Sequence, residues 1–120
     1  MNDGKLAAKE ARFAEIIWKN EPLPIQQLIG LSQQEFGWDR TTTYTVLRRL
    51  TKQGLFCNEN QTVRALITRE EYYAKQGERL IDEAFDGSLP AFLAAFTAQK
   101  DLTQKELDEI RRMIDRLKEE

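Results

Sequence analysis

Residues 39–52 read Asp-Arg-Thr-Thr-Thr-Tyr-Thr-Val-Leu-Arg-Arg-Leu-Thr-Lys, and this segment decides the fold. Asp39 is a typical helix N-cap, and Gly54 behind the segment is suited to end a helix. We therefore predict a helix over residues 40–53. Helical spacing assigns its inward stripe to Thr43, Val46, Leu47 and Leu50.

The outward face of this helix has an unusual composition for a solvated surface. Threonine is a mediocre helix former, so four threonines in five positions are not there for helix stability. Hydroxyl, phenol and guanidinium groups at the start of a helix suit base edges and phosphates in a DNA major groove. A threonine-rich cap followed by a solvated basic face is the alternative interpretation. The outward residues are Arg40, Thr41, Tyr44, Thr45, Arg48 and Lys52.

Two further helices are expected before this segment. Residues 6–19 lack glycine and proline, and their apolar positions fall mostly on one helical face. Pro24 fits the first turn of a second helix, which ends at Gly37. Trp18 and Trp38 are predicted to anchor the core. Three short helices with tight connections are the minimal helix-turn-helix arrangement.

The pattern changes from helical to extended after Gly54. Residues 55–58 and 63–68 are short apolar or β-branched runs, separated by the polar turn 59–62, and so predict a β-hairpin. Cys57 is expected to pack within that hairpin. Because the hairpin follows the third helix directly, the fold class is mainly α with a small β-hairpin, a winged helix-turn-helix domain.

The rest of the chain predicts helices with unpartnered apolar stripes. A helix from Arg69 to about Phe85 is followed by one capped by Ser88 and by one with a capping box at Thr103. The stripe on the last helix covers about two heptads, too short to be stable alone in water. It must bury against its own winged-helix domain or against a second copy of the chain.

We favour the second copy, because a two-fold axis would present two recognition helices to a palindromic site. The predicted organisation is a DNA-binding winged-helix domain over residues 1–68 and a C-terminal helical dimerisation region over residues 69–120. The residues assigned to dimerisation are Leu89, Phe92, Leu93, Phe96, Leu107, Ile110, Ile114 and Leu117.

The charge of the chain is unevenly distributed. The net charge of −2 over 120 residues argues by itself against a nucleic-acid partner. However, residues 1–64 carry 9 basic and 7 acidic side chains, whereas residues 65–120 carry 9 and 13. A local basic patch on an acidic chain is what a site-specific phosphate binder of modest charge would show. The patch consists of Arg40, Arg48, Arg49, Lys52 and Arg64.

Composition also argues against catalysis. The absence of histidine excludes Ser/His/Asp triads, Cys/His pairs and the usual zinc sites, and the single cysteine excludes an intramolecular disulfide. Paired acids lie where solvated helix faces are expected. We therefore expect no enzyme, no cofactor and no metal. Without a long apolar run or a signal-peptide pattern, we also expect no membrane partner and a cytoplasmic location.

Three segments together resemble the penicillinase repressor family (BlaI/MecI/CopY). They are Ile16-Ile17-Trp18, the segment from Trp38 to Gly54, and Phe85-Asp86-Gly87-Ser88. The resemblance implies a bacterial winged-helix repressor that dimerises through C-terminal helices and binds a palindromic operator, often with a TACA/TGTA core. It further implies that Arg40, Thr41, Thr42, Tyr44 and Thr45 face bases. Arg48, Lys52 and Arg64 would then hold the DNA backbone.

The chain departs from the family pattern at the two sequence features through which family members respond to a signal. Copper-responsive members carry a Cys-x-Cys cluster near the C-terminus, and no cysteine follows Cys57 here. β-Lactam-responsive members are cleaved by a sensor protease at an Asn-Phe bond, and the matching pair here is Ala95-Phe96. We hypothesise that derepression uses another ligand or another protease specificity.

The sequence thus predicts a homodimeric transcriptional repressor on a palindromic operator of double-stranded DNA. The alternative is a winged-helix protein-interaction module without DNA binding, which the net charge and the weakly basic hairpin turn support. An enzyme is the remaining hypothesis. The residues assigned to DNA binding are Arg40, Thr41, Thr42, Tyr44, Thr45, Arg48, Arg49, Lys52 and Arg64.

Overall fold

The computed structural model describes residues 5–119, which form two compact units. The first unit ends at Gly77 and the second begins at Glu78. The boundary lies inside helix α4 (Arg69–Phe85), so the first turns of this helix belong to the first unit.

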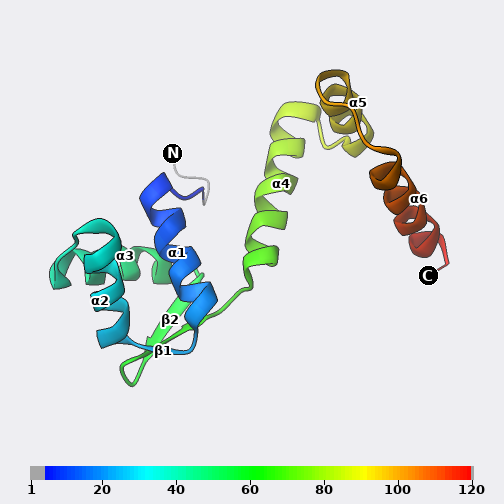
Figure 1. The fold of residues 1–120 in the computed structure, drawn as a ribbon. Coiled ribbons are helices and arrows are strands. Elements are labelled where there is room, and N and C mark those ends of the chain that lie inside the picture. Colours follow the sequence, from blue (N-terminus) through cyan, green and yellow to red (C-terminus); the bar gives the residue numbers. More distant parts are fainter. Residues whose placement is uncertain (1–4, 120) are drawn as a thin grey trace. The chain divides into compact units, whose positions relative to one another are not determined.

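The first unit is a winged helix, as predicted (Figure 1). Its helices are α1 (Ala8–Asn20), α2 (Ile25–Phe36) and α3 (Arg40–Lys52). Strands β2 (Phe56–Glu59) and β3 (Thr62–Ala65) form the hairpin directly after α3. The fold class, mainly α with a small β-hairpin, is confirmed.

A third strand, β1 (Leu23–Pro24), completes an antiparallel sheet with the order β1-β3-β2. The sequence does not predict β1, because two residues that include a proline show no strand alternation. Pro24 is consequently the N-cap of α2, one residue before the helical position expected for it. At the same edge, the Ile25 backbone N–H donates to the Gln61 carbonyl at 2.8 Å.

The core of the first unit lies between the three helices and the sheet. Phe13 and Ile17 from α1, Leu28 from α2 and Leu50 from α3 are fully buried. The sheet adds Phe56, which is also fully buried. The inward stripe predicted for α3 is confirmed, since Thr43, Val46, Leu47 and Leu50 are all buried.

Both tryptophans pack against this core, as predicted. The ring of Trp38 lies 5.5 Å from that of Phe13, between centroids, immediately before the N-cap of α3. The Trp18 ring lies 5.3 Å from that of Phe56, and its indole N–H donates to the Ile67 carbonyl at 3.1 Å. Trp18 thereby ties α1 to the hairpin and to the chain that follows it.

The second unit contains the end of α4 followed by α5 (Leu89–Gln99) and α6 (Gln104–Lys118). The predicted caps are confirmed: the Ser88 hydroxyl accepts from the Ala91 backbone N–H at 3.1 Å. Thr103 and Glu106 form the reciprocal capping box, with bonds of 3.0 and 3.1 Å. These local bonds define where α5 and α6 begin.

The second unit buries none of its described residues, 78–119. Large apolar side chains of α5 and α6 remain accessible instead; Ile114 is 48% exposed and Leu117 is 69% exposed. Ring contacts at 5.6 Å between Phe85 and Phe92 and at 5.8 Å between Phe92 and Phe96 do not enclose a core. The unit therefore has the helices of a domain without the buried surface that stabilises one.

Candidate nucleic-acid interface

The start of α3 is fixed by the residues around Asp39. Gly37 takes the left-handed conformation, with a φ of 70°, and ends α2. The Asp39 carboxylate then accepts from the Thr42 backbone N–H at 2.8 Å, which is the predicted N-cap. This backbone hydrogen bond also holds the pKa of Asp39 below its usual range.

The threonines of α3 have different local roles. Thr43 is fully buried and its hydroxyl donates to the Asp39 carbonyl at 3.0 Å. The Thr45 hydroxyl donates to the Thr41 carbonyl at 2.9 Å, which leaves its acceptor lone pairs toward solvent. Thr41 and Thr42 are exposed on the first turn. Three of the four threonines in the first two turns of α3 therefore present polar groups on the outside of the helix.

The remaining outward residues lie where the sequence predicts them. Arg40, Arg48 and Lys52 are exposed and Tyr44 is half-buried. The Arg40 guanidinium lies over the Tyr44 ring, 5.4 Å from its centroid, and donates to the Gln26 side chain at 3.3 Å. The first two turns of α3 thus combine cationic, phenolic and hydroxyl groups on one accessible face.

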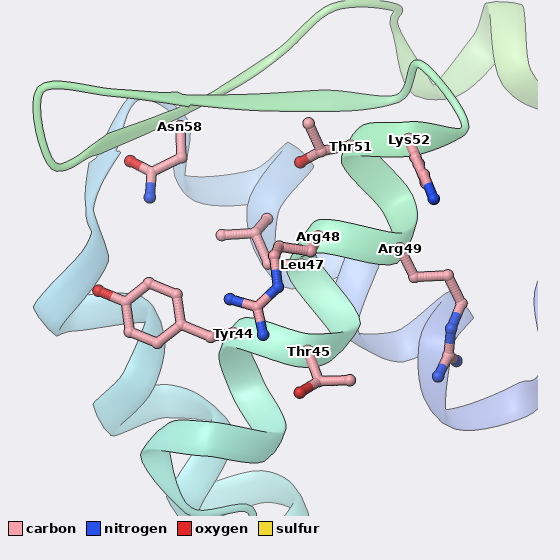
Figure 2. Close-up of a pocket in the computed structure, with 8 residues that line it drawn as sticks. All are labelled: Tyr44, Thr45, Leu47, Arg48, Arg49, Thr51, Lys52 and Asn58. Carbon is pink, nitrogen blue, oxygen red and sulfur yellow. The ribbon is translucent and has the colours of Figure 1, made fainter.

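An open groove of about 670 Å³ runs along this face, between α3 and the hairpin (Figure 2). We call the β2–β3 hairpin the wing and this groove the α3–wing groove. None of its lining residues is acidic, and seven of the eight belong to α3. The eighth comes from β2. The lining consists of Tyr44, Thr45, Leu47, Arg48, Arg49, Thr51, Lys52 and Asn58.

The cations of this groove differ in their partners. Neither Arg48 nor Lys52 forms an ion pair within residues 5–119, so both charges are available to an anion. Arg49 instead pairs with Glu10 of α1, whose side chain is only 10% exposed. In Figure 2 Arg49 accordingly points away from the side on which Tyr44 and Arg48 lie.

Arg64 is not brought into the groove. The hairpin register pairs Arg64 with Cys57 and Val63 with Asn58, so Arg64 and Asn58 lie on opposite faces of the hairpin. Val63 is fully buried, which identifies its face as the one turned toward the core. Arg64 is exposed on the other face, the outer side of the wing.

A second groove, of about 340 Å³, lies between α1 and α2 and has a different character. It is lined by both charge signs, and Arg12 is paired with Glu35 at 3.2 Å. Arg12 also lies over the Phe36 ring, 5.1 Å from its centroid. The arginine of this second groove is therefore already paired with a carboxylate, so the α3–wing groove is the better candidate for an anionic partner.

No group of three or more His, Cys, Asp or Glu side chains is placed to hold a metal ion among residues 5–119. Over the same residues, no helix has both the length and the apolar character needed to cross a bilayer.

Comparison with known proteins identifies the family. The model of the penicillinase repressor family matches residues 6–116. The chain belongs to the penicillinase repressor family. As a member it is a transcriptional repressor, and the family is regulatory rather than enzymatic. The family resemblance expected from the three sequence segments is thereby confirmed.

Curated relatives within the family are distant. The methicillin resistance regulatory protein MecI of Staphylococcus aureus strain Mu50 is 22% identical over 116 residues, which cover 93% of this chain and 94% of that protein. MecI of Staphylococcus epidermidis is 21% identical over the same length. The similarity thus extends over both units of the fold.

Proposed function

We propose that this repressor acts as a homodimer that binds a palindromic operator, with α3 of each subunit in a major groove. The observation that carries the proposal is the outer face of α3. It presents two unpaired cations and several hydroxyl groups along a groove without a carboxylate. DNA offers the matching surface, because its groove edges accept hydrogen bonds and its walls are anionic.

Within α3 we assign different roles to its two ends. The N-terminal residues of a recognition helix reach base edges, whereas later turns approach the phosphates. Base reading is therefore assigned to Arg40, Thr41, Thr42, Tyr44 and Thr45. Arg48 and Lys52 hold the backbone, and Arg64 holds it from the outer face of the wing.

Residues 1–68 supply DNA binding in this proposal, and residues 69–120 supply dimerisation. The support for a dimer is the second unit, which buries none of its described residues and exposes Leu107, Ile114 and Leu117 on α6. Pairing of two copies would give this apolar surface a partner. A two-fold dimer also matches a palindrome, so one symmetry explains both features.

Truncation of Arg40 and Lys52 separates base reading from backbone holding. Arg40→Ala or Thr41→Ala is expected to cost about 1–3 kcal/mol on the operator and to relax the preference at one base position. Lys52→Ala is expected to weaken binding to operator and scrambled duplexes by similar factors. It should also reduce by about one the salt slope, which is the steepness with which the logarithm of the affinity falls with the logarithm of the salt concentration. Binding titrations on both duplexes at two salt concentrations measure these effects.

The two variants serve as controls for each other, because each removes one cation from the same helix. Equal losses of Arg40→Ala on operator and scrambled DNA would mean that the start of α3 holds phosphate, contrary to the assignment. A loss confined to the operator for Lys52→Ala would contradict the backbone role.

The second candidate function is a protein-interaction module that has lost DNA binding. It is favoured by the net charge of −2 and by a hairpin turn, Asn60-Gln61, that carries no basic residue. The two functions differ in their salt dependence, because phosphate contacts release counterions and protein contacts of an acidic module do not. Binding to DNA that weakens steeply between about 50 and 200 mM salt excludes the module.

A further inference from the structure

The wing contributes one side chain to the α3–wing groove, and no pattern in the sequence singles this residue out. Asn58 belongs to β2, whereas every other lining residue belongs to α3. Figure 2 shows its amide pointing away from the hairpin, on the side where the Tyr44 ring lies. The groove therefore has two walls, and Asn58 is the polar group on the second.

The hairpin register explains why Asn58 faces α3. Asn58 is paired with Val63 and lies two residues after Phe56, so all three share one face of the hairpin. Phe56 and Val63 are fully buried in the core, whereas Asn58 is exposed. Asn58 thus continues the core-facing side of the hairpin to the point where the core ends and the groove begins.

The environment of Asn58 is suited to an anion. Its amide makes no hydrogen bond within the described residues, and the opposite wall holds the unpaired Arg48 and Lys52. The next residue, Glu59, is turned to the other face of the hairpin by its pairing with Thr62. Two cations, an amide donor and no carboxylate are the groups that hold phosphate without reading sequence.

We propose that the α3–wing groove holds one sugar-phosphate strand of the operator, with Asn58 donating its amide N–H to a phosphate oxygen opposite Arg48 and Lys52. This inference rests on the proposed DNA-binding function and adds a residue of the wing to it. Asn58 secures affinity and register here and carries no base preference, because phosphates are the same at every position.

The test compares two changes at Asn58 with one control change at Asn60, at the hairpin tip. Asn58→Ala removes one neutral donor and is expected to weaken operator and scrambled duplexes alike, by about fivefold, without changing the salt slope. Asn58→Asp places a carboxylate in the groove and is expected to weaken both by about tenfold or more at low salt and to lower the slope by about one. Asn60 does not line the groove, so Asn60→Asp is expected to change affinity by less than about twofold.

Each outcome of these titrations either supports or overturns the contact of Asn58 with phosphate. A loss for Asn58→Ala on the operator alone would make Asn58 a base reader and overturn the phosphate role. Equal losses for Asn58→Asp and Asn60→Asp would show a general effect of wing charge and overturn it as well. If the unchanged protein binds no duplex at any salt concentration, the proposed function itself fails. If it binds and Asn58→Ala matches it, only the present inference fails.

Discussion

Replacing Ile110 and Ile114 together with aspartate is expected to convert the protein from a dimer of about 28 kDa into a monomer of 14.0 kDa. Both residues lie on the apolar stripe of α6, and Ile114 is 48% exposed in the single chain. In a dimer these positions would be enclosed in an apolar seam of about 2,000 Å² or more. Four carboxylates from two chains cannot be buried there without partners, so association is lost.

Sedimentation equilibrium at micromolar concentration measures this change directly. A matched control introduces two aspartates at Lys105 and Arg112, which helical spacing places on the opposite face of α6. That control is expected to remain dimeric and to bind the operator. The account would be contradicted by an unchanged protein that sediments as a monomer, or by a double Ile variant that remains a dimer.

Replacing Arg49 with methionine is expected to destabilise the winged-helix unit, although the Arg49 side chain itself is half exposed. The Glu10 carboxylate, with a side chain 10% exposed, would lose the guanidinium with which it is paired. Removing one partner of such a pair leaves a poorly solvated charge, at a cost of about 2–3 kcal/mol, reduced because Arg49 is 52% exposed. For a unit of this size the melting temperature should fall by about 10 °C.

Thermal unfolding of Arg49→Met and Arg48→Met provides the comparison, because the two arginines are adjacent and only Arg49 is paired. Arg48→Met is expected to leave the melting temperature within about 2 °C and to reduce the salt slope of DNA binding by about one. Combining Arg49→Met with Glu10→Gln should recover part of the lost stability, since no unpaired carboxylate remains. Equal melting temperatures for Arg48→Met and Arg49→Met would refute a stabilising role for the Glu10 pair.

The features that the sequence predicts are those set by neighbouring residues. The N-cap at Asp39, the glycine end of α2 at Gly37 and the capping box at Thr103 each depend on groups within a few positions. The inward stripe of α3 follows from the helical period alone. Thr68 and Glu71 also form a capping box at the start of α4, with bonds of 2.9 and 3.0 Å. This capping box could have been predicted from the same local pattern as the one at Thr103.

The features that the sequence does not predict depend on strand register and on distant contacts. Asn58 faces the groove and Arg64 faces away from it because of the pairing in the hairpin, and a shift by one residue would exchange their faces. The pair of Glu10 with Arg49 joins positions 39 residues apart. Periodicity within a single helix contains no information about which residue of another helix it meets.

The end of the winged-helix unit is also set by tertiary packing. Tyr72 of α4 is buried, and its ring lies 5.8 Å from that of Trp18. Arg69 pairs with Glu15 at 2.7 Å, which raises the pKa of the arginine. These contacts attach the first turns of α4 to the first unit. The change of sequence pattern at Arg69 marks where a helix starts, whereas packing decides to which unit its turns belong.

Selection of bound sequences from a random pool of double-stranded DNA tests the central claim most directly. The unchanged protein, at physiological salt, is expected to enrich one palindrome whose half-sites are related by the two-fold axis of the dimer. Their centres should lie about one helical turn, or a whole number of turns, apart. Enrichment of a single site without internal symmetry would contradict the dimeric account, and the absence of any enriched sequence would contradict operator recognition by α3.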